Sequence, residues 1–189
     1  ARKDGKYRYY SRVGRMLFDE FDSATPFTGD MAVVKSAGRA RLINSRGMDI
    51  LSGNFSDIMI AGDSTLFIMD SLSKWTVTDL SGTPRSTKKY DAVGRFSDGL
   101  APVETGSKYG YINPAGKEVI AVNMTSFGDM SALGFKNKRA KTSYRGKYGM
   151  ISTTGKRLLP NLFDDIITAD TWPVPVQKSG LWGYANDKV

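Results

Sequence analysis

The chain of 189 residues contains no histidine and no cysteine. Without histidine it lacks the commonest general base, the commonest metal ligand and the side chain that titrates near neutral pH. The two absences together exclude Ser-His-Asp and Cys-His catalysis, disulfides and cysteine-ligated zinc. No run of about 18 apolar residues is present, so no membrane-spanning helix is expected. Any catalytic site would have to use carboxylates, lysine or tyrosine.

Two pairs of adjacent acids are the candidates for such a site, Asp19/Glu20 and Asp164/Asp165. A glycosidase needs two carboxyl groups that flank a sugar bond across a cleft. Adjacent residues of an extended strand point to opposite faces, so neither pair fits that geometry. No glycine-rich phosphate loop is present either. We therefore expect no enzyme, no cofactor and no metal, and a carboxylate-dependent glycosidase is the lowest-ranked alternative.

The chain does contain six copies of one short phrase. The phrase is an aromatic residue, a small residue and an alternating apolar pair, followed by a turn former, as in Tyr109-Gly110-Tyr111-Ile112-Asn113. Successive copies lie 33, 35, 34, 39 and 34 residues apart, and a fixed period in this range is typical of repeat architectures. The copies begin at Tyr7, Ala40, Trp75, Tyr109, Tyr148 and Trp182.

Each copy reads as a strand that enters a tight turn. In the first five copies a glycine follows six residues after the second position, which fits a hairpin site with positive φ. A second strand follows the turn, and another precedes the phrase, as in Leu100–Val103 before Tyr109. Each repeat is therefore expected to form a three-stranded antiparallel meander. The turn glycines are Gly14, Gly47, Gly82, Gly116 and Gly155.

These features predict an all-β fold of tandem repeats of about 34 residues, each an antiparallel three-stranded meander or hairpin. Propeller blades usually have four strands and 40 or more residues, so the shorter period favours an open or partly closed array. The whole chain, 1–189, is expected to be a single repeat domain. Its approximate repeats are 5–38, 39–71, 72–106, 107–146, 147–180 and the partial repeat 181–189.

The phrases resemble the WG-repeat family, also called KWG repeats. Its pattern runs aromatic-Gly-Tyr-Ile-Asp, a turn with Gly-Lys, Val-Ile-Pro, Tyr-Asp, then Phe-x-x-Gly-Leu-Ala-x-Val. The best match runs from Phe96 to Ile120, and the resemblance extends over nearly the whole chain. It implies a bacterial repeat protein, often secreted or surface-associated, with a binding role. It implies no catalytic residue.

The charge is unevenly distributed along the chain. From Met130 to Phe163 there are eight basic residues and no acid, whereas the rest holds 19 of each sign, so the net charge of +8 belongs to this segment. If the segment is a binding surface for an anionic partner, its cations should lie exposed on one loop or strand face. The alternative is a solvated loop that aids solubility. The candidate binding residues are Lys136, Lys138, Arg139, Lys141, Tyr144, Arg145 and Lys147.

The preferred function is a non-catalytic protein-binding scaffold. A domain that binds a glycan or another anionic polymer is the first alternative, using the basic segment and exposed aromatics such as Tyr9, Tyr111 and Tyr184. Nucleic acid is disfavoured, because the segment lacks a groove-reading helix and any known motif. The start at Ala1, without Met or a visible signal peptide, fits both a processed export and an engineered start. We expect a secreted, periplasmic or cell-surface protein, and a cytoplasmic one stays open.

Overall fold

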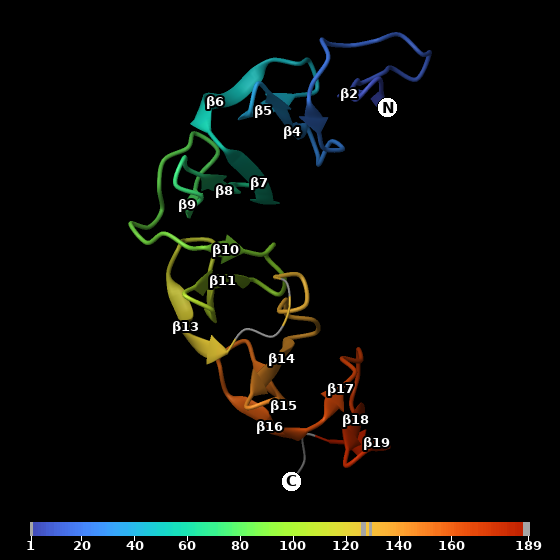
Figure 1. The fold of residues 1–189 in the computed structure, drawn as a ribbon, viewed down its shortest axis with the longest axis vertical. Helices are drawn as coiled ribbons and strands as arrows, with labels where there is room; N and C mark the ends of the chain where they lie inside the picture. The colour runs from blue at the N-terminus through green and yellow to red at the C-terminus, as the bar shows by residue number, and fades with distance from the viewer. Residues whose placement is uncertain (1, 126–127, 129, 187–189) are drawn as a thin grey trace. The chain divides into compact units, whose positions relative to one another are not determined.

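A computed structural model describes residues 2–125, 128 and 130–186, and every regular element among them is a β-strand. The chain divides into two compact units, Ala1–Lys89 and Tyr90–Val189. In each unit the strands form small antiparallel sheets and follow one another in chain order (Figure 1). The predicted all-β fold of antiparallel meanders is confirmed. The open or partly closed form of the array concerns the placement of the two units and stays a prediction, as do the repeat boundaries.

The first unit contains three sheets among its described residues, with the strand orders β1-β2, β3-β4-β5-β6 and β7-β8-β9. The strands are β1 (Arg2–Lys3), β2 (Lys6–Tyr7), β3 (Ser23–Ala24), β4 (Met31–Ser36), β5 (Arg39–Asn44), β6 (Asp49–Phe55), β7 (Asp57–Gly62), β8 (Thr65–Met69) and β9 (Trp75–Thr78).

The second unit also contains three sheets among its described residues, with the orders β10-β11-β12-β13, β14-β15-β16 and β17-β18-β19. The strands are β10 (Ala92–Val93), β11 (Ala101–Thr105), β12 (Lys108–Ile112), β13 (Glu118–Thr125), β14 (Arg139–Tyr144), β15 (Lys147–Ser152), β16 (Arg157–Phe163), β17 (Asp165–Ile166), β18 (Val174–Lys178) and β19 (Leu181–Ala185).

The five turn glycines occupy equivalent hairpin positions, as predicted. Their φ angles lie between 77° and 82°, the left-handed region that L side chains rarely adopt. Each glycine N–H donates to the carbonyl three residues earlier, over 2.9–3.2 Å. The residue that opens each turn also accepts backbone N–H groups through its side chain, as Asn113 does from Ala115 and Lys117. The turn chemistry of the sequence thus fixes where each hairpin reverses.

The third copy of the phrase, Trp75–Asp79, lies at the same place as the others. It begins on β9, the third strand of its sheet, and the second, fourth and sixth copies likewise lie on the third strands β5, β12 and β19. Trp75 pairs with Met69 of the preceding strand as Tyr109 pairs with Glu104. The repeat differs in its loops: β8 and β9 are joined by the longer turn from Asp70 to Lys74, in which Ser73 has φ 59°, and the chain after Gly82 returns through a single bridge from Thr78 to Pro84.

The hydrophobic cores lie between consecutive sheets. In the first unit, Leu42 of β5 packs with Ile58 and Leu66 of the next sheet. In the second, Met150 of β15 packs with Val174 and Val176 of β18. No single sheet of three short strands can bury its apolar face alone, so each repeat depends on its neighbour, as expected for a repeat array.

The strand that follows the phrase is bulged where it crosses the glycine of the phrase. The pairing of β12 with β13 and of β15 with β16 shifts register beside Gly110 and Gly149. A Cβ at Gly110 would lie 2.5 Å from the Ile120 carbonyl oxygen, and one at Gly149 would lie 2.7 Å from that of Leu159. These two glycines are therefore required by the close approach of a backbone.

Candidate functional site

Three of the predicted binding cations are paired with acids that follow the basic segment in sequence. Lys136 Nζ lies 2.8 Å from Asp170, and Lys141 Nζ lies 2.5 Å from Asp165. Lys147 forms an ion pair with Asp164. Lys141 also lies over the ring of Tyr148, with 3.9 Å to its centroid. Much of the charge that the sequence concentrates in one segment is therefore neutralised by the next repeat.

These ion pairs also appear in the acidities of the three carboxyl groups. Hydrogen bonds from Lys147, Lys141 and Lys136 are the main reason that the pKa values of Asp164, Asp165 and Asp170 lie below the ordinary value. Hydrogen bonding and opposite charge both favour the ionised form of a carboxyl group. The acids thus stay ionised and keep the three lysines engaged.

The remaining predicted residues are split between the interior and the surface. Arg139 is buried, donates to the Ala169 carbonyl at 2.8 Å and stacks on Trp172 at 5.0 Å, so it cannot be part of an exposed patch. Lys138 and Arg145 are exposed, and Tyr144 is 56% exposed. The predicted residues therefore do not lie together on one exposed face, although a binding role for individual members stays a prediction.

The proposed ladder of aromatics is not formed either. Tyr111 is fully buried beside Tyr109, and its hydroxyl donates to the Leu133 carbonyl at 2.6 Å. Tyr9 is half-buried, and Tyr184 is exposed. Residues two apart on a strand share a face, so Tyr109 and Tyr111 both enter the core between sheets. Burial raises the pKa of each of these two hydroxyls.

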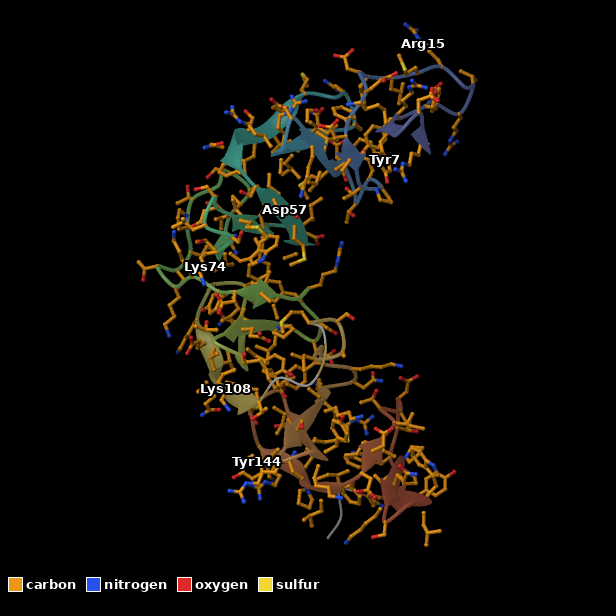
Figure 2. The ribbon with its side chains drawn as sticks, viewed as in Figure 1. Tyr7, Arg15, Asp57, Lys74, Lys108 and Tyr144 are labelled. Atoms are coloured by element: carbon orange, nitrogen blue, oxygen red, sulfur yellow. The ribbon has the colours of Figure 1, made fainter. Side chains whose placement is uncertain are left out.

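One predicted residue, Tyr144, does line a groove in the second unit. The groove has a volume of about 440 Å³ and lies between the sheet of β12 and β13 and the sheet of β14 to β16. Figure 2 labels Lys108 and Tyr144, two of the residues that line it. The side chains that give it a chemical character are Lys108, Asn123, Thr125, Tyr144, Arg157 and Asn161.

The groove is cationic and lacks acids. Neither Lys108 nor Arg157 forms an ion pair within the part of the chain that the structure describes, and the Lys108 ammonium donates only to Thr125 Oγ1, at 3.2 Å. The Arg145 guanidinium lies over the Tyr144 ring at 5.3 Å and adds a third positive charge nearby. Two exposed cations beside an exposed aromatic ring suit an anionic or amphipathic ligand.

Sequence reasoning missed Lys108 and did not select Arg157. Lys108 directly precedes the phrase at Tyr109, and Arg157 opens the third strand of the next repeat, two residues after Gly155. Asp49 and Glu118 stand at the position that Arg157 occupies in β16. The change of sign at one repeat position was the available signal, because a charge that departs from the repeat pattern marks a local feature.

A larger cavity lies in the first unit, with a volume of about 710 Å³ and mainly apolar walls. Its charged groups are already occupied by the protein itself. Arg85 donates to Thr65 Oγ1 at 3.0 Å and to the Ser64 carbonyl at 2.7 Å, and Lys89 pairs with Asp70 at 2.6 Å. The groove of the second unit is therefore the stronger candidate for a charged ligand.

The adjacent acids do not gather into a site. Asp164 and Asp165 pair with different lysines, and Glu20 pairs with Arg8. Across residues 2–125, 128 and 130–186 there is no cluster of three acids that could hold a metal ion. The same residues include no helix of the length and apolarity needed to cross a membrane.

Three solved structures share the fold of this chain. The computationally designed Ika8 protein aligns over 96% of this chain and 65% of its own, with a TM-score of 0.54 and 14% identity. BamB from Moraxella catarrhalis aligns over 93% and 65%, with a TM-score of 0.51 and 13% identity. The C-terminal WD40 domain of Sif2 aligns over 92% and 58%, with a TM-score of 0.54 and 15% identity. The chain thus spans less than two thirds of each.

At such identities the likeness shows the fold alone, a β-repeat fold of the propeller and WD40 kind. No curated protein matches the sequence. The family model described as "WG containing repeat" matches residues 7–39 and 75–109. The first matched segment includes the first copy of the phrase, in which Arg8 replaces the glycine. The resemblance stated from the sequence is confirmed for these two segments, which match the WG-repeat model.

Proposed function

We propose that this chain is a non-catalytic scaffold that binds an acidic segment of a partner protein in the groove of Lys108, Tyr144 and Arg157. The repeat family and the β-repeat fold indicate a repeat binding module. Repeat arrays present a continuous surface to a partner rather than a closed catalytic pocket. The observation that carries the choice of ligand is the groove itself, which joins two unpaired cations to an exposed tyrosine and has no acid in its lining.

The groove supports binding rather than catalysis. Its titratable lining groups are Lys108, Tyr144 and Arg157, and none has a carboxylate or imidazole neighbour in the lining that could act as a general base. Cations and a tyrosine ring supply charge and flat apolar area, the features that recognise an acidic side chain and the aliphatic chain beside it. An acidic stretch of protein is therefore the best-matched ligand.

A glycan with carboxylate or sulfate groups is the second candidate. It is favoured by the exposed Tyr144 ring beside the side-chain amides of Asn123 and Asn161, because sugars combine an apolar face with many hydroxyl groups. The cations would then bind its acidic groups. This candidate uses the same residues, so the experiment must separate the two ligands by their chemistry.

The test compares a labelled peptide of alternating glutamate and glycine with an oligosaccharide of uronic acids. The peptide should bind the protein, and raising the salt from 0.05 M to 0.5 M should weaken the binding, because screening shortens the reach of exposed charges to less than about 10 Å. The double substitution Lys108→Ser with Arg157→Ser should weaken binding by roughly fivefold, since each exposed charge contributes about 0.2–1 kcal/mol.

Lys178→Ser is the matched control, because Lys178 is an exposed lysine of the same unit outside the groove. It should leave the affinity unchanged. Equal binding of the peptide to the wild type and to the double variant would contradict the proposed site. Binding of the oligosaccharide without binding of the peptide, lost in the double variant, would favour the glycan-binding function.

A further inference from the structure

The cavity of the first unit and the groove of the second unit lie at equivalent positions of two repeats. Each is lined by the last residues of one sheet and by the sheet that follows it in the chain. The strand registers align the two linings, because Phe55 pairs with the first phrase position of its repeat as Met124 does. By the same registers Asp70 is equivalent to Tyr144, Gly82 to Gly155, and Pro84 to Arg157.

The turn glycines confirm this equivalence. A Cβ at Gly82 would lie 3.1 Å from Leu51 Cδ1, and a Cβ at Gly155 would lie 3.5 Å from Ile120 Cγ1. Leu51 and Ile120 both pair with the third phrase position of their repeats. The cavity and the groove are therefore one recurring feature of the repeat, a hollow between two consecutive sheets.

The cavity is the larger hollow, with about 710 Å³ against about 440 Å³ for the groove. In other repeats the strand after the phrase pairs back to the first phrase position, as β16 does. In the third repeat the pairing ends with the bridge of Thr78 to Pro84 and a hydrogen bond from the Arg85 N–H to the Val77 carbonyl. Residues 86–89 thus leave the edge of β9, and three of them line the cavity instead: Ser86, Thr87 and Lys89.

The two hollows differ in charge at the positions that give the groove its character. Where the groove has Tyr144 and Arg157, the cavity has Asp70 and Pro84. Asp70 is paired with Lys89 at 2.6 Å, so an acidic or a basic ligand would have to compete with a charge that is already present. A ligand without charge avoids this competition.

The lining matches an uncharged ligand with a flat apolar body. Phe55, Ile68 and Pro84 supply apolar walls. Asn54 and Thr87 also line the cavity, and within the described residues their side chains form no hydrogen bond, so they can bond a carbonyl or hydroxyl group of the ligand. A mainly apolar cavity of several hundred Å³ with a few polar groups is the usual form of a small-molecule site.

We propose that the cavity of the first unit is a second ligand site, which binds a small uncharged molecule with a flat apolar body. Residues 70 and 84 then select its ligand in the way that residues 144 and 157 select that of the groove. This role of the two positions rests on the acidic ligand proposed for the groove, whereas the cavity as a site rests on its own lining.

The test uses the dye N-phenyl-1-naphthylamine, which is uncharged and whose fluorescence rises in an apolar site. It should bind the wild-type chain saturably, and raising the salt from 0.05 M to 0.5 M should change its affinity less than about twofold, because the dye has no charge to be screened. Thr76→Phe should weaken binding at least about tenfold, since Thr76 lines the cavity and the larger ring would take the place of the dye. The melting temperature of this variant should not fall, because the cavity has room for the ring.

An exchange of the two selecting positions should change the ligand. Pro84→Arg with Asp70→Asn gives the cavity the charge of the groove, and an asparagine at residue 70 can still accept the N–H groups of Leu72 and Lys74. In a chain whose groove is disabled by Lys108→Ser and Arg157→Ser, this exchange should restore binding of the glutamate-glycine peptide. It should also weaken binding of the dye at least about threefold, because an apolar ligand would desolvate the new charge.

Thr28→Phe is the matched control, because Thr28 is exposed in the same unit and does not line the cavity. It should leave the affinity for the dye unchanged. Absence of saturable dye binding to the wild type, unchanged binding in Thr76→Phe, or loss of binding in Thr28→Phe would each overturn the proposal.

Two other occupants give distinct results, and each would also overturn the proposal. Displacement of the dye by a tryptophan-containing peptide but not by free indole would assign the cavity to a partner protein. Dye binding that weakens as the protein concentration rises would assign it to a second copy of the chain.

The acidic peptide separates this site from the function proposed for the groove. A wild type that binds the peptide and an exchanged chain that does not would overturn the role of residues 70 and 84. Failure of the peptide to bind the wild type would contradict the function proposed for the groove, while the dye would still decide whether the cavity is a ligand site.

Discussion

At the scale of single residues, glycine has two separate roles in this fold. At the hairpin turns it supplies a positive φ, as at Gly155 with φ 78°. On the strand that carries the phrase it removes a side chain from the path of another backbone, as at Gly149. A Cβ at Gly183 would have none of the described atoms within 4 Å. The two roles predict different consequences when a methyl group is added.

Gly149→Ala should destabilise the protein strongly, and Gly183→Ala should not. The new Cβ at residue 149 would lie 2.7 Å from the Leu159 carbonyl oxygen and 2.9 Å from the Asn161 nitrogen, which forces β15 and β16 apart. A loss of about 1–3 kcal/mol in the free energy of unfolding is expected from such overpacking. Urea denaturation of both variants checks this, and an equal effect of the two substitutions would contradict the assigned roles.

Ser73→Gly should stabilise the protein, and Gly155→Ala should destabilise it. Ser73 holds a φ of 59° in the loop between β8 and β9, and a side chain in that region costs about 1–2 kcal/mol. Because glycine also gains freedom in the unfolded chain, the net gain should be about 0.5–1 kcal/mol. The Cβ of Gly155→Ala would lie at an ordinary contact distance of 3.5 Å from Ile120. The loss of stability in this variant should therefore come from the positive φ alone. Thermal unfolding measures both changes.

At the scale of the elements, the sequence determines local structure well and cross-strand partners poorly. The turn glycines and the meanders follow from local chemistry, since each hairpin is closed by residues within five positions of one another. The loop from Asp70 to Lys74 has the hydrogen bonds of the phrase turns but no glycine, so the glycine pattern did not predict it. The exposed positive charge of the basic segment was overestimated, because the acids that neutralise it lie beyond Phe163 and only the folded chain brings them to Lys141 and Lys147.

These pairs between repeats make stability depend on pH. The hydrogen bond from Lys141 holds the pKa of Asp165 below its ordinary value of about 3.9. A carboxyl group whose folded pKa is depressed contributes stability that is present above its unfolded pKa and is lost as the pH falls through its folded pKa. The melting temperature should therefore decrease as the pH is lowered below about 4. In Asp165→Asn this decrease should be smaller.

Asp19→Asn is the control for this measurement, because Asp19 is exposed and forms no ion pair within the described residues. Its melting temperature should follow the wild type through the acid range. Identical pH profiles for Asp165→Asn and the wild type between pH 6 and pH 3 would show that the Lys141 pair contributes nothing to stability.

At the scale of the whole molecule, the chain consists of two compact units that each contain their own cores. The cluster around Leu42 and Leu66 lies in the first unit, and the clusters around Tyr111 and Met150 lie in the second. Repeat proteins are stabilised mainly by contacts between neighbouring repeats, so their unfolding need not be a single cooperative step. The proposed groove belongs to the second unit.

The two units should therefore unfold in separable transitions. Scanning calorimetry of the wild type should give a calorimetric enthalpy larger than the van't Hoff enthalpy, the sign of more than one cooperative unit. Gly149→Ala weakens a sheet of the second unit, so it should lower the temperature of one transition and leave the other in place. Ser73→Gly, in the first unit, should raise the other transition instead. A single transition that is shifted by both substitutions would contradict this prediction. It would mean that all repeats unfold together, so that a local change in free energy alters the stability of the whole chain.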